Sequence, residues 1–479
     1  MSQVVILHGW SDKSSSFKPL AEFLQANGYD AIPIWLGDYK SLDDDVRIED
    51  VGKRMESVLR QLIDEGPLEP PFDLIVHSTG GLVAREWLSA HYAHDMGACP
   101  VKRLIMLAPA NFGSRLASTG KSLVGRVIKG WDNWFASGAE MLTALELSSS
   151  YQWNLAQRDL FVPEHLDGAP ALYGADGVWP FILTGTHPYT SRLRQIVNEN
   201  GGDGTVRACA ANLNTRGLTI DFSSDEDQPV LTPWRLRDDS AFPFAVLADR
   251  THSSIIKPDG SDVNSSDALK GRLRELPLAA LGCDDFATYR QMATDWHAVS
   301  EETAALAHDE QRRRDAFSSR SQPEAEFFHQ YMQVNVRVVD DHGNDVHDYF
   351  LEFSGPDDER GDDSSVYFHR EVLEHVHTFG GNASQRCLYL DRTDLRYNYY
   401  EAIRGDVARV LNMSLSAAPP GDNVRYFDSF RTGARGMLPL HFEDQDEDRV
   451  RWLKRNTTHF VKIVIPRQPR EQVFKLKSF

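Results

Sequence analysis

Long apolar runs are absent from this chain of 479 residues. No run approaches the roughly 18 apolar residues that a helix needs to cross a bilayer, which excludes a membrane-spanning helix. A secretory leader, with a basic start, an apolar centre and small residues before the cleavage point, is not visible either. We therefore expect a cytoplasmic protein, and export by a signal-independent route stays open.

Cysteine is also scarce. The four cysteines are scattered, and no two of them have the close spacing of a zinc-binding pair. This pattern excludes a disulfide framework and a zinc ribbon, and it indicates reduced thiols in a reducing compartment. The four positions are Cys99, Cys209, Cys283 and Cys387.

Positive charge is in deficit, because 51 Lys and Arg residues stand against 70 Asp and Glu residues, for a net charge of −19. Binding of nucleic acid needs clustered Lys and Arg, so we expect no nucleic-acid partner. The same deficit argues against strong attraction of the whole molecule to an anionic membrane. The acidic runs at 43–45 and 357–359 are interpreted as solvated loops, since neither matches a complete calcium-loop signature.

The most informative segment that is present reads D-L-I-V-H-S-T-G-G-L-V, from Asp73 to Val83. An apolar strand leads into a tight turn with Ser78, two glycines follow, and a helix-compatible stretch begins. This is the layout of a nucleophile elbow, which exposes a serine hydroxyl to a base. Val76 stands where the usual G-x-S-x-G pattern has glycine, so an ordinary turn serine stays an alternative.

A candidate acid follows a late strand expected at 181–186. Asp203 lies in the loop N-G-G-D-G-T-V, whose glycines would let its carboxylate turn toward an imidazole. A plain Asp-Gly turn is the alternative interpretation. Asp167 and Asp176 are weaker candidates, because both precede the strand.

The base should follow the acid, since the chain order Ser, Asp, His is the one that hydrolases with such an elbow use. His252 comes shortly after the last expected strand of the sheet, at 244–247. His165 and His187 precede the acid, and His297 lies in a polar helix well past the sheet. We interpret these three as surface or capping histidines.

Stabilising a tetrahedral oxyanion needs two backbone N–H groups aimed at it. One donor usually comes from the residue after the nucleophile and the other from the loop after an early strand. The first apolar strand of this chain ends in H-G-W at 8–10. We therefore assign Thr79 and Trp10 as donors, with Ser11 as the second choice for the loop position, and expect His8 to shape the loop.

These motifs make the chain resemble a serine α/β-hydrolase of the bacterial lipase and phospholipase kind, over approximately residues 1–280. The G-D-G-T-V string is similar to the acid loop of lecithin:cholesterol acyltransferase-like lipases. The string L-A-P-A-N-F-G-S at 107–114 resembles the loop after the sixth strand in lipases with a mobile lid. The other motifs that carry the resemblance are H-G-W at 8–10, V-H-S-T-G-G at 76–81 and T-H-S at 251–253.

Residues 114–160 interrupt the alternation of strands and helices. Apolar and aromatic residues recur there at helical spacing, with basic residues between them. One interpretation is a mobile lid that opens on lipid and contacts a membrane surface transiently. The other is a helical cap that is packed permanently on the sheet. In both, the side chains that would line the acyl pocket are Leu123, Val127, Trp131, Trp134 and Phe135.

The hydrophobic pattern predicts an α/β fold, with a mostly parallel sheet and helices on both of its faces. The sheet would be a minimal α/β-hydrolase sheet, because the first two strands of the full version are missing. Strands are expected at 3–8, 31–35, 72–77, 102–108, 180–185, 218–222 and 243–248, and helices at 17–27, 47–64 and 81–93.

Length predicts more than one domain. Residues 1–283 would form the catalytic domain, and residues 284–325 a long polar helix and a linker. Residues 326–479 would form a mostly-β accessory domain of the sandwich type. This domain would stabilise the protein, mediate oligomerisation, or dock a lipid or protein partner. Its strands are expected at 332–339, 349–353, 365–369, 386–391, 435–442 and 459–465, with a helical piece near 401–411.

Together these segments predict a serine ester hydrolase that forms an acyl-enzyme on Ser78, with His252 as base and Asp203 as its partner. Such chemistry needs no metal ion and no organic cofactor. The tryptophan-containing insertion favours a lipid ester, as in a lipase, a phospholipase A or an esterase. The same three residues would also serve a thioesterase or an amidase, and a binding protein that lost catalysis is a further alternative.

Overall fold

The computed structural model describes residues 2–7, 14–34, 45–119, 138–162, 170–191, 194–225, 229–260, 263–354, 363–405, 410–426, 438–441 and 453–475. The chain divides into two compact units. The first unit comprises Met1–Asn214 and Leu236–Gln330, and the second comprises Thr215–Arg235 and Tyr331–Phe479.

The first unit is built on a six-stranded sheet in the order β2-β1-β3-β4-β5-β8, and every neighbouring pair is parallel. The central strand β3 is buried at all six positions, which explains why its residues are apolar apart from Asp73 and His77. This arrangement confirms the predicted α/β-hydrolase fold. The strands are β1 (Gln3–Leu7), β2 (Asp30–Ile34), β3 (Phe72–His77), β4 (Val101–Leu107), β5 (Trp179–Gly185) and β8 (Phe244–Leu247).

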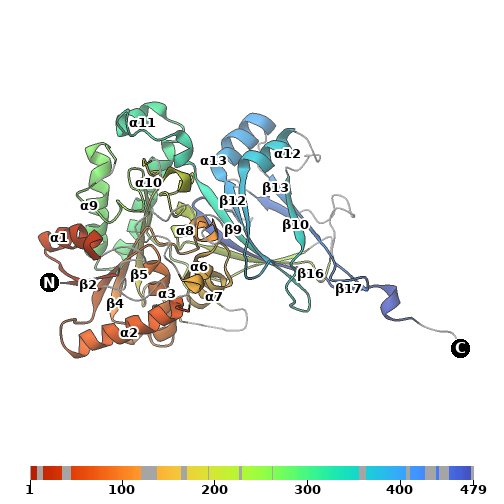
Figure 1. Cartoon of the computed structure of the whole chain (residues 1–479), viewed down its shortest axis with the longest axis horizontal. Coiled ribbons are helices and arrows are strands. Elements are labelled where there is room, and N and C mark those ends of the chain that lie inside the picture. The colour runs from red at the N-terminus through yellow and green to blue at the C-terminus, as the bar shows by residue number, and fades with distance from the viewer. Residues whose placement is uncertain are drawn as a thin grey trace. The chain divides into compact units, whose positions relative to one another are not determined.

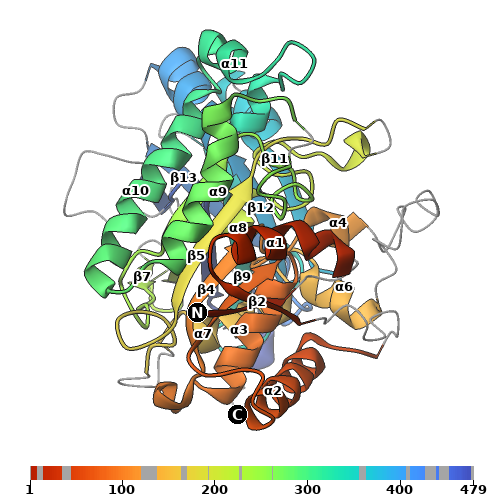
Figure 2. The same ribbon diagram turned by 90° about the vertical axis from the view of Figure 1, so that its left-hand side faces the viewer.

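Helices cover both faces of this sheet. Figure 1 shows α2 and α3 on one side of the strands and α9 and α10 on the other, and the turned view in Figure 2 agrees. Apolar residues of α2 recur every three or four positions, and Ile48, Val51, Met55 and Leu59 among them are buried, so the helix forms because one of its faces can be covered. The helices are α1 (Lys18–Ala26), α2 (Ile48–Asp64), α3 (Gly80–His91), α4 (Arg115–Thr119), α6 (Ala139–Leu145), α7 (Ser150–Asp159), α8 (Ala208–Ala211), α9 (Asp267–Leu281), α10 (Phe286–Ala305) and α11 (Glu310–Ala316).

Helix α10, expected to lead out of the catalytic part, packs on the last strand of the first unit. Ser300 Oγ accepts a hydrogen bond from the backbone N–H of Val246 at 3.0 Å, and Thr303 Oγ1 donates to the carbonyl oxygen of the same residue at 2.7 Å. Trp296 on α10 lies against Phe181 of β5, with the ring centroids 5.7 Å apart. The first unit therefore extends to Gln330.

A buried ion pair joins α3 to α7. Arg85 Nε lies 2.7 Å from Asp159 Oδ2, and both side chains are fully buried. The guanidinium also donates to the backbone oxygen of Asn111 at 2.8 Å, and the Tyr173 hydroxyl donates to Asp159 at 3.2 Å. These bonds compensate for the desolvation of both charges, and they attach the end of the 114–160 insertion to the helix after Ser78.

We predict that Arg85→Met lowers the free energy of unfolding by about 3–5 kcal/mol, because it leaves the Asp159 carboxylate buried without its counter-charge. Urea denaturation of the full chain measures the change. The matched control is Lys18→Met, since Lys18 pairs with Glu22 on the surface, with side chains 73% and 62% exposed. An exposed pair contributes at most about 1 kcal/mol. Equal losses in the two variants would contradict the prediction.

The second unit contains a six-stranded mixed sheet in the order β11-β12-β9-β16-β6-β7, a three-stranded sheet in the order β10-β13-β15, and the small pair β14-β17. Its buried core combines Val336 and Ile463 of the larger sheet with Leu351 and Leu411 of the smaller one. The expected mostly-β, sandwich-like character is confirmed. The strands are β6 (Arg216–Asp221), β7 (Val230–Pro233), β9 (Tyr331–Asp340), β10 (Tyr349–Ser354), β11 (Leu373–Thr378), β12 (Gln385–Asp391), β13 (Val410–Ala417), β14 (Val424–Arg425), β15 (Leu438–His441), β16 (Thr457–Ile465) and β17 (Gln468–Pro469).

The strand expected at 218–222 exists, but its assignment to the first sheet is wrong. It is β6, which pairs in parallel with β16 and antiparallel with β7 in the second unit. A half-buried pattern states only that one face of a strand is covered. The pairing partner, far along the chain, is not encoded in that pattern.

The strand expected at 365–369 is also wrong, because this segment is helical. Helix α12 (Asp363–Tyr367) runs into a π-helix at Phe368–Val372. Ser365, Phe368 and Val372 are all buried, at the three- and four-residue spacing of one helix face, whereas in a strand Ser365 and Phe368 would point to opposite faces. The helical piece expected near 401–411 lies earlier, as a π-helix at Leu395–Arg404 that ends at Gly405 with φ 64°.

Within the insertion at 114–160, the described residues include the helices α4, α6 and α7. None of the helices in the described part of the chain has both the length and the apolar content that crossing a bilayer requires. The five expected acyl-pocket residues lie outside the described residues; they are Leu123, Val127, Trp131, Trp134 and Phe135.

Candidate active site

Ser78 lies in the turn between β3 and α3, at the carboxyl end of the central strand. Its φ angle is 55°, in the left-handed region that side-chain-bearing residues rarely adopt. Backbone hydrogen bonds hold this conformation: the Ser78 N–H donates to the oxygen of Leu107, and its carbonyl accepts from Gly81 and Ala110, all at 3.1 Å. The turn therefore presents a serine hydroxyl at the edge where open sheets place their sites.

Two positions of the elbow motif, Gly81 after the serine and Val76 before it, have different surroundings. A Cβ on Gly81 would lie 2.7 Å from the Cβ of Pro109, so only glycine lets α3 approach the loop after β4. Val76, which stands where the usual motif has glycine, is fully buried and pairs with Leu7 of β1 and Met106 of β4. The sheet therefore has room for the side chain of Val76 where the usual motif has glycine.

The structure brings three of the predicted residues together. His252 Nε2 lies 3.0 Å from Ser78 Oγ, and His252 Nδ1 lies 2.8 Å from Asp203 Oδ2. The backbone N–H of His252 also donates to the carbonyl oxygen of Asp203 at 2.9 Å. A serine hydroxyl, an imidazole and a carboxylate thus form one continuous chain of hydrogen bonds.

The two carboxylate oxygens of Asp203 have different hydrogen-bond partners. Oδ1 accepts hydrogen bonds from the backbone N–H groups of Thr205 and Val206, at 2.9 and 2.8 Å, which leaves Oδ2 for the imidazole. Gly204 has φ 92°, and a Cβ there would meet the ring of Tyr189. Burial, followed by the Asp203 charge, raises the pKa of the Tyr189 phenol, so it stays neutral beside the carboxylate. Both ring nitrogens of His252 and both oxygens of Asp203 are engaged in this way.

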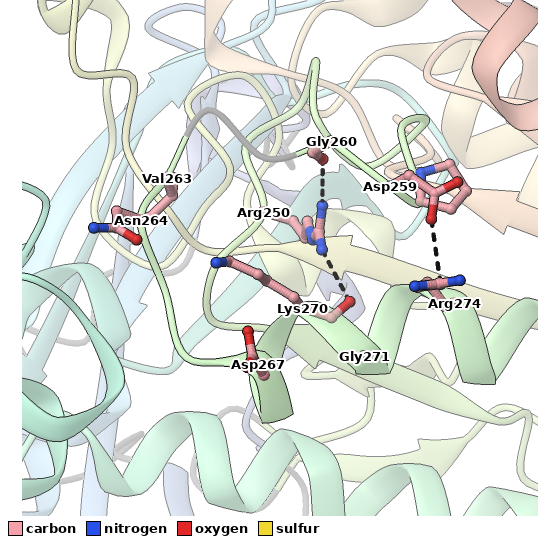
Figure 3. A pocket seen from close by; sticks show the side chains of 10 residues that line it. Arg250, Asp259, Gly260, Val263, Asn264, Asp267, Lys270, Gly271 and Arg274 are labelled. Carbon is pink, nitrogen blue, oxygen red and sulfur yellow. Dashed lines mark hydrogen bonds and ion pairs between the residues drawn. The ribbon is translucent and has the colours of Figure 1, made fainter.

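Arg250 anchors the loop that carries His252, and sequence reasoning assigned it no role. Its guanidinium is 1% exposed and donates to the carbonyl oxygens of Gly260 at 2.7 Å and Lys270 at 3.2 Å, as Figure 3 shows. These bonds attach the segment after β8 to the loop after His252 and to the start of α9. A cavity of about 680 Å³ borders the anchor, and an ion pair between Arg274 and Asp259 at 3.3 Å lies at its edge. No sequence motif marks Arg250, because the hydrogen bonds that anchor it go to backbone carbonyls; its Nε also lies 3.3 Å from Oδ1 of the neighbouring Asp249.

The competing candidates lie elsewhere. Asp176 is exposed. His187 is buried, with its ring nitrogens 2.9 Å from the oxygen of Pro188 and 3.2 Å from that of Ser321. His297 is on the surface of α10, 3.7 Å from Glu301. Asp167 and His165 lie outside the described residues.

One of the expected oxyanion donors is described. Thr79 is buried and directly precedes α3. Its backbone N–H is therefore one of the N–H groups at the start of the helix that have no partner within the helix. His8, Trp10 and Ser11 lie outside the described residues. The pairing of Thr79 with Trp10 stays a prediction.

Comparison with known proteins identifies the family and the fold. Residues 4–358 match the family model described as "Alpha/beta hydrolase family". No curated protein sequence matches the chain. The solved structure of phospholipase PlaB from Legionella pneumophila is similar, with 24% identity, a TM-score of 0.77, and coverage of 99% of this chain and 96% of that one. The same phospholipase in complex with thio-NAD gives 24% identity and a TM-score of 0.77, over 100% and 96% of the two chains. At this identity the likeness to these structures shows the fold.

Proposed function

Because this chain belongs to the alpha/beta hydrolase family, we propose that it hydrolyses carboxylic esters through an acyl-enzyme on Ser78. The observation that carries the proposal is the chain of hydrogen bonds from Ser78 Oγ through His252 to Asp203, at 3.0 and 2.8 Å. A protein that had only kept the fold would have no need for this geometry or for the left-handed backbone at the serine.

The proposed reaction begins when Ser78 Oγ attacks the acyl carbonyl carbon while His252 Nε2 takes the hydroxyl proton. Asp203 holds the imidazole in the tautomer that can accept this proton and stabilises the imidazolium that forms. His252 then protonates the leaving alcohol, and the alkoxy bond breaks to leave the acyl group on Ser78. A water molecule, activated by the same imidazole, releases the carboxylic acid and restores the serine.

The negative charge that develops on the carbonyl oxygen needs donors that are already in place. In this proposal they are the backbone N–H groups of Thr79 and Trp10. The support for Thr79 is its place directly after Ser78 and before α3, where a helix leaves its first N–H groups without partners inside the helix.

We propose a lipid ester as the substrate class. The apolar, tryptophan-containing insertion at 114–160 supports a long acyl chain, and a transient contact with a membrane surface would pass through this insertion. A further support is that the structurally similar protein from Legionella pneumophila is named a phospholipase. The C-terminal β unit is proposed as the place for any protein partner.

We predict that the protein hydrolyses long-chain p-nitrophenyl esters and phospholipids in mixed micelles faster than short soluble esters, because a long chain gains about 0.8 kcal/mol for each methylene it buries. Initial rates over a series of chain lengths, below and above the critical micelle concentration, measure this. A thioester and an anilide of the same acyl chain complete the panel. Preference for the thioester or the anilide would replace the ester proposal, and a preference for acetate esters would remove the lipid part of it.

A further inference from the structure

His77, the residue before Ser78, is buried at the end of β3, with an exposed fraction of 2%. Its Nε2 atom lies 3.0 Å from the backbone oxygen of His252. A carbonyl oxygen can only accept a hydrogen bond, so Nε2 of His77 must carry the proton and donate. This contact joins the strand that carries the nucleophile to the loop that carries the base.

The ring of His77 is held in place by packing on two sides. The ring of Phe17 lies edge-on with the centroids 5.7 Å apart, and the ring of His252 lies at 4.7 Å. Because packing restricts the ring, the direction of its Nε2–H bond is restricted with it.

The contacts of His252 show what this bond contributes. Its backbone N–H donates to Asp203, its Nδ1 faces Asp203 Oδ2, and its Nε2 faces Ser78 Oγ. The bond from His77 is the contact among these that holds the main chain of the base to the strand of the nucleophile. Ser78 and His252 are thereby linked in two ways. The Ser78 hydroxyl contacts the His252 imidazole directly, and the backbone oxygen of His252 is bonded to His77, the residue next to Ser78 in the chain.

We propose that His77 is a positioning residue, which sets the separation of Ser78 Oγ and His252 Nε2 by donating from Nε2 to the carbonyl oxygen of His252. The inference rests on the proposed function. A displacement of about 1 Å in a reacting pair costs on the order of 100-fold in rate, so a bond that fixes the pair acts mainly on kcat.

Three variants of the full chain test this role. His77→Phe keeps the ring and removes the donor. His77→Gln places an amide nitrogen about as far from the Cα as Nε2, and His77→Asn places one about where Nδ1 lies, too short to reach the carbonyl. The readouts are kcat and KM for one p-nitrophenyl ester, and the rate of labelling by a fluorophosphonate probe, with folding followed by thermal denaturation.

We expect His77→Phe and His77→Asn to lower kcat and the labelling rate by about 10- to 100-fold with KM nearly unchanged, and His77→Gln to recover most of the loss. If His77→Phe does not fold, the Gln and Asn variants decide, because they differ only in reach. Equal kcat in those two variants, or wild-type kcat in all three, would overturn the proposal. Ser78→Ala is measured alongside: if it stays active, the proposed function has failed, whereas an inactive Ser78→Ala with a fully active His77→Phe rejects the role of His77 alone.

Discussion

Ser78→Ala is expected to lower ester hydrolysis by about 10⁴- to 10⁶-fold while the protein stays folded. The substitution removes Oγ, the nucleophile of the proposed acyl transfer, which lies 3.0 Å from His252 Nε2. It leaves the backbone intact, because the bonds that hold the turn run from main-chain groups of Ser78 to Leu107, Gly81 and Ala110. Any activity that remains would come from the oxyanion donors and from substrate binding.

The measurement combines kinetics with a fluorophosphonate probe, whose adduct is located by mass spectrometry. We expect the adduct on Ser78 and no labelling of the variant. Ser89→Ala is the matched control, since Ser89 lies on α3, is buried, and donates its hydroxyl to the backbone oxygen of Glu86 at 3.1 Å. An adduct on another serine, or a Ser78→Ala variant with wild-type rates on every ester, would disprove the acyl-enzyme on Ser78.

Asp203→Asn is expected to lower kcat by about 10⁴-fold. The structure decides which way the new amide would face. The N–H groups of Thr205 and Val206 require an acceptor at the position of Oδ1, so the amide oxygen must stay there and the NH₂ group must take the position of Oδ2. The NH₂ group would then donate to His252 Nδ1, which forces the imidazole proton onto Nε2. In that tautomer His252 cannot accept a proton from Ser78.

The control for this prediction is Asp176→Asn. It makes the same chemical change at an exposed aspartate that sequence reasoning also weighed as the acid, and we expect no change in kcat. Thermal denaturation checks that the Asp203 loop still folds, as its backbone bonds to the side-chain oxygen are retained. Asp203→Asn with kcat within about tenfold of the wild-type value would argue that the carboxylate does not set the tautomer.

Hydrogen bonds hold the loop that carries Asp203 and the loop that carries His252 in place, and thereby fix the positions of the acid and the base. The acid loop is held by bonds from its own backbone to Asp203, whereas the base loop is held by the buried guanidinium of Arg250 and by the contact with His77. Acid and base are joined directly by the bond from the His252 N–H to the Asp203 oxygen. Rigid supports of this kind are what a reacting hydrogen-bond chain requires.

Local pattern was enough to predict the strands of the first sheet, the elbow at Ser78, and the candidates Asp203 and His252. The reason is that each is marked by a short stretch of chain. A buried parallel strand is mostly apolar, an elbow needs small residues next to the serine, and the acid loop needs glycines at left-handed positions such as Gly204. The order of these stretches along the chain follows from the fold, so it was also readable from the sequence.

Contacts between distant segments were decided only by the tertiary structure. The strand at 216–221 has the same pattern whether it joins the first sheet or pairs with β16, and pairing with β16 placed it in the second unit. The helical path at 363–372 became favourable because one face of it could be buried. Arg250 and His77 act through bonds to backbone carbonyls, and a carbonyl is present at every residue, so no residue type in the sequence could reveal either contact.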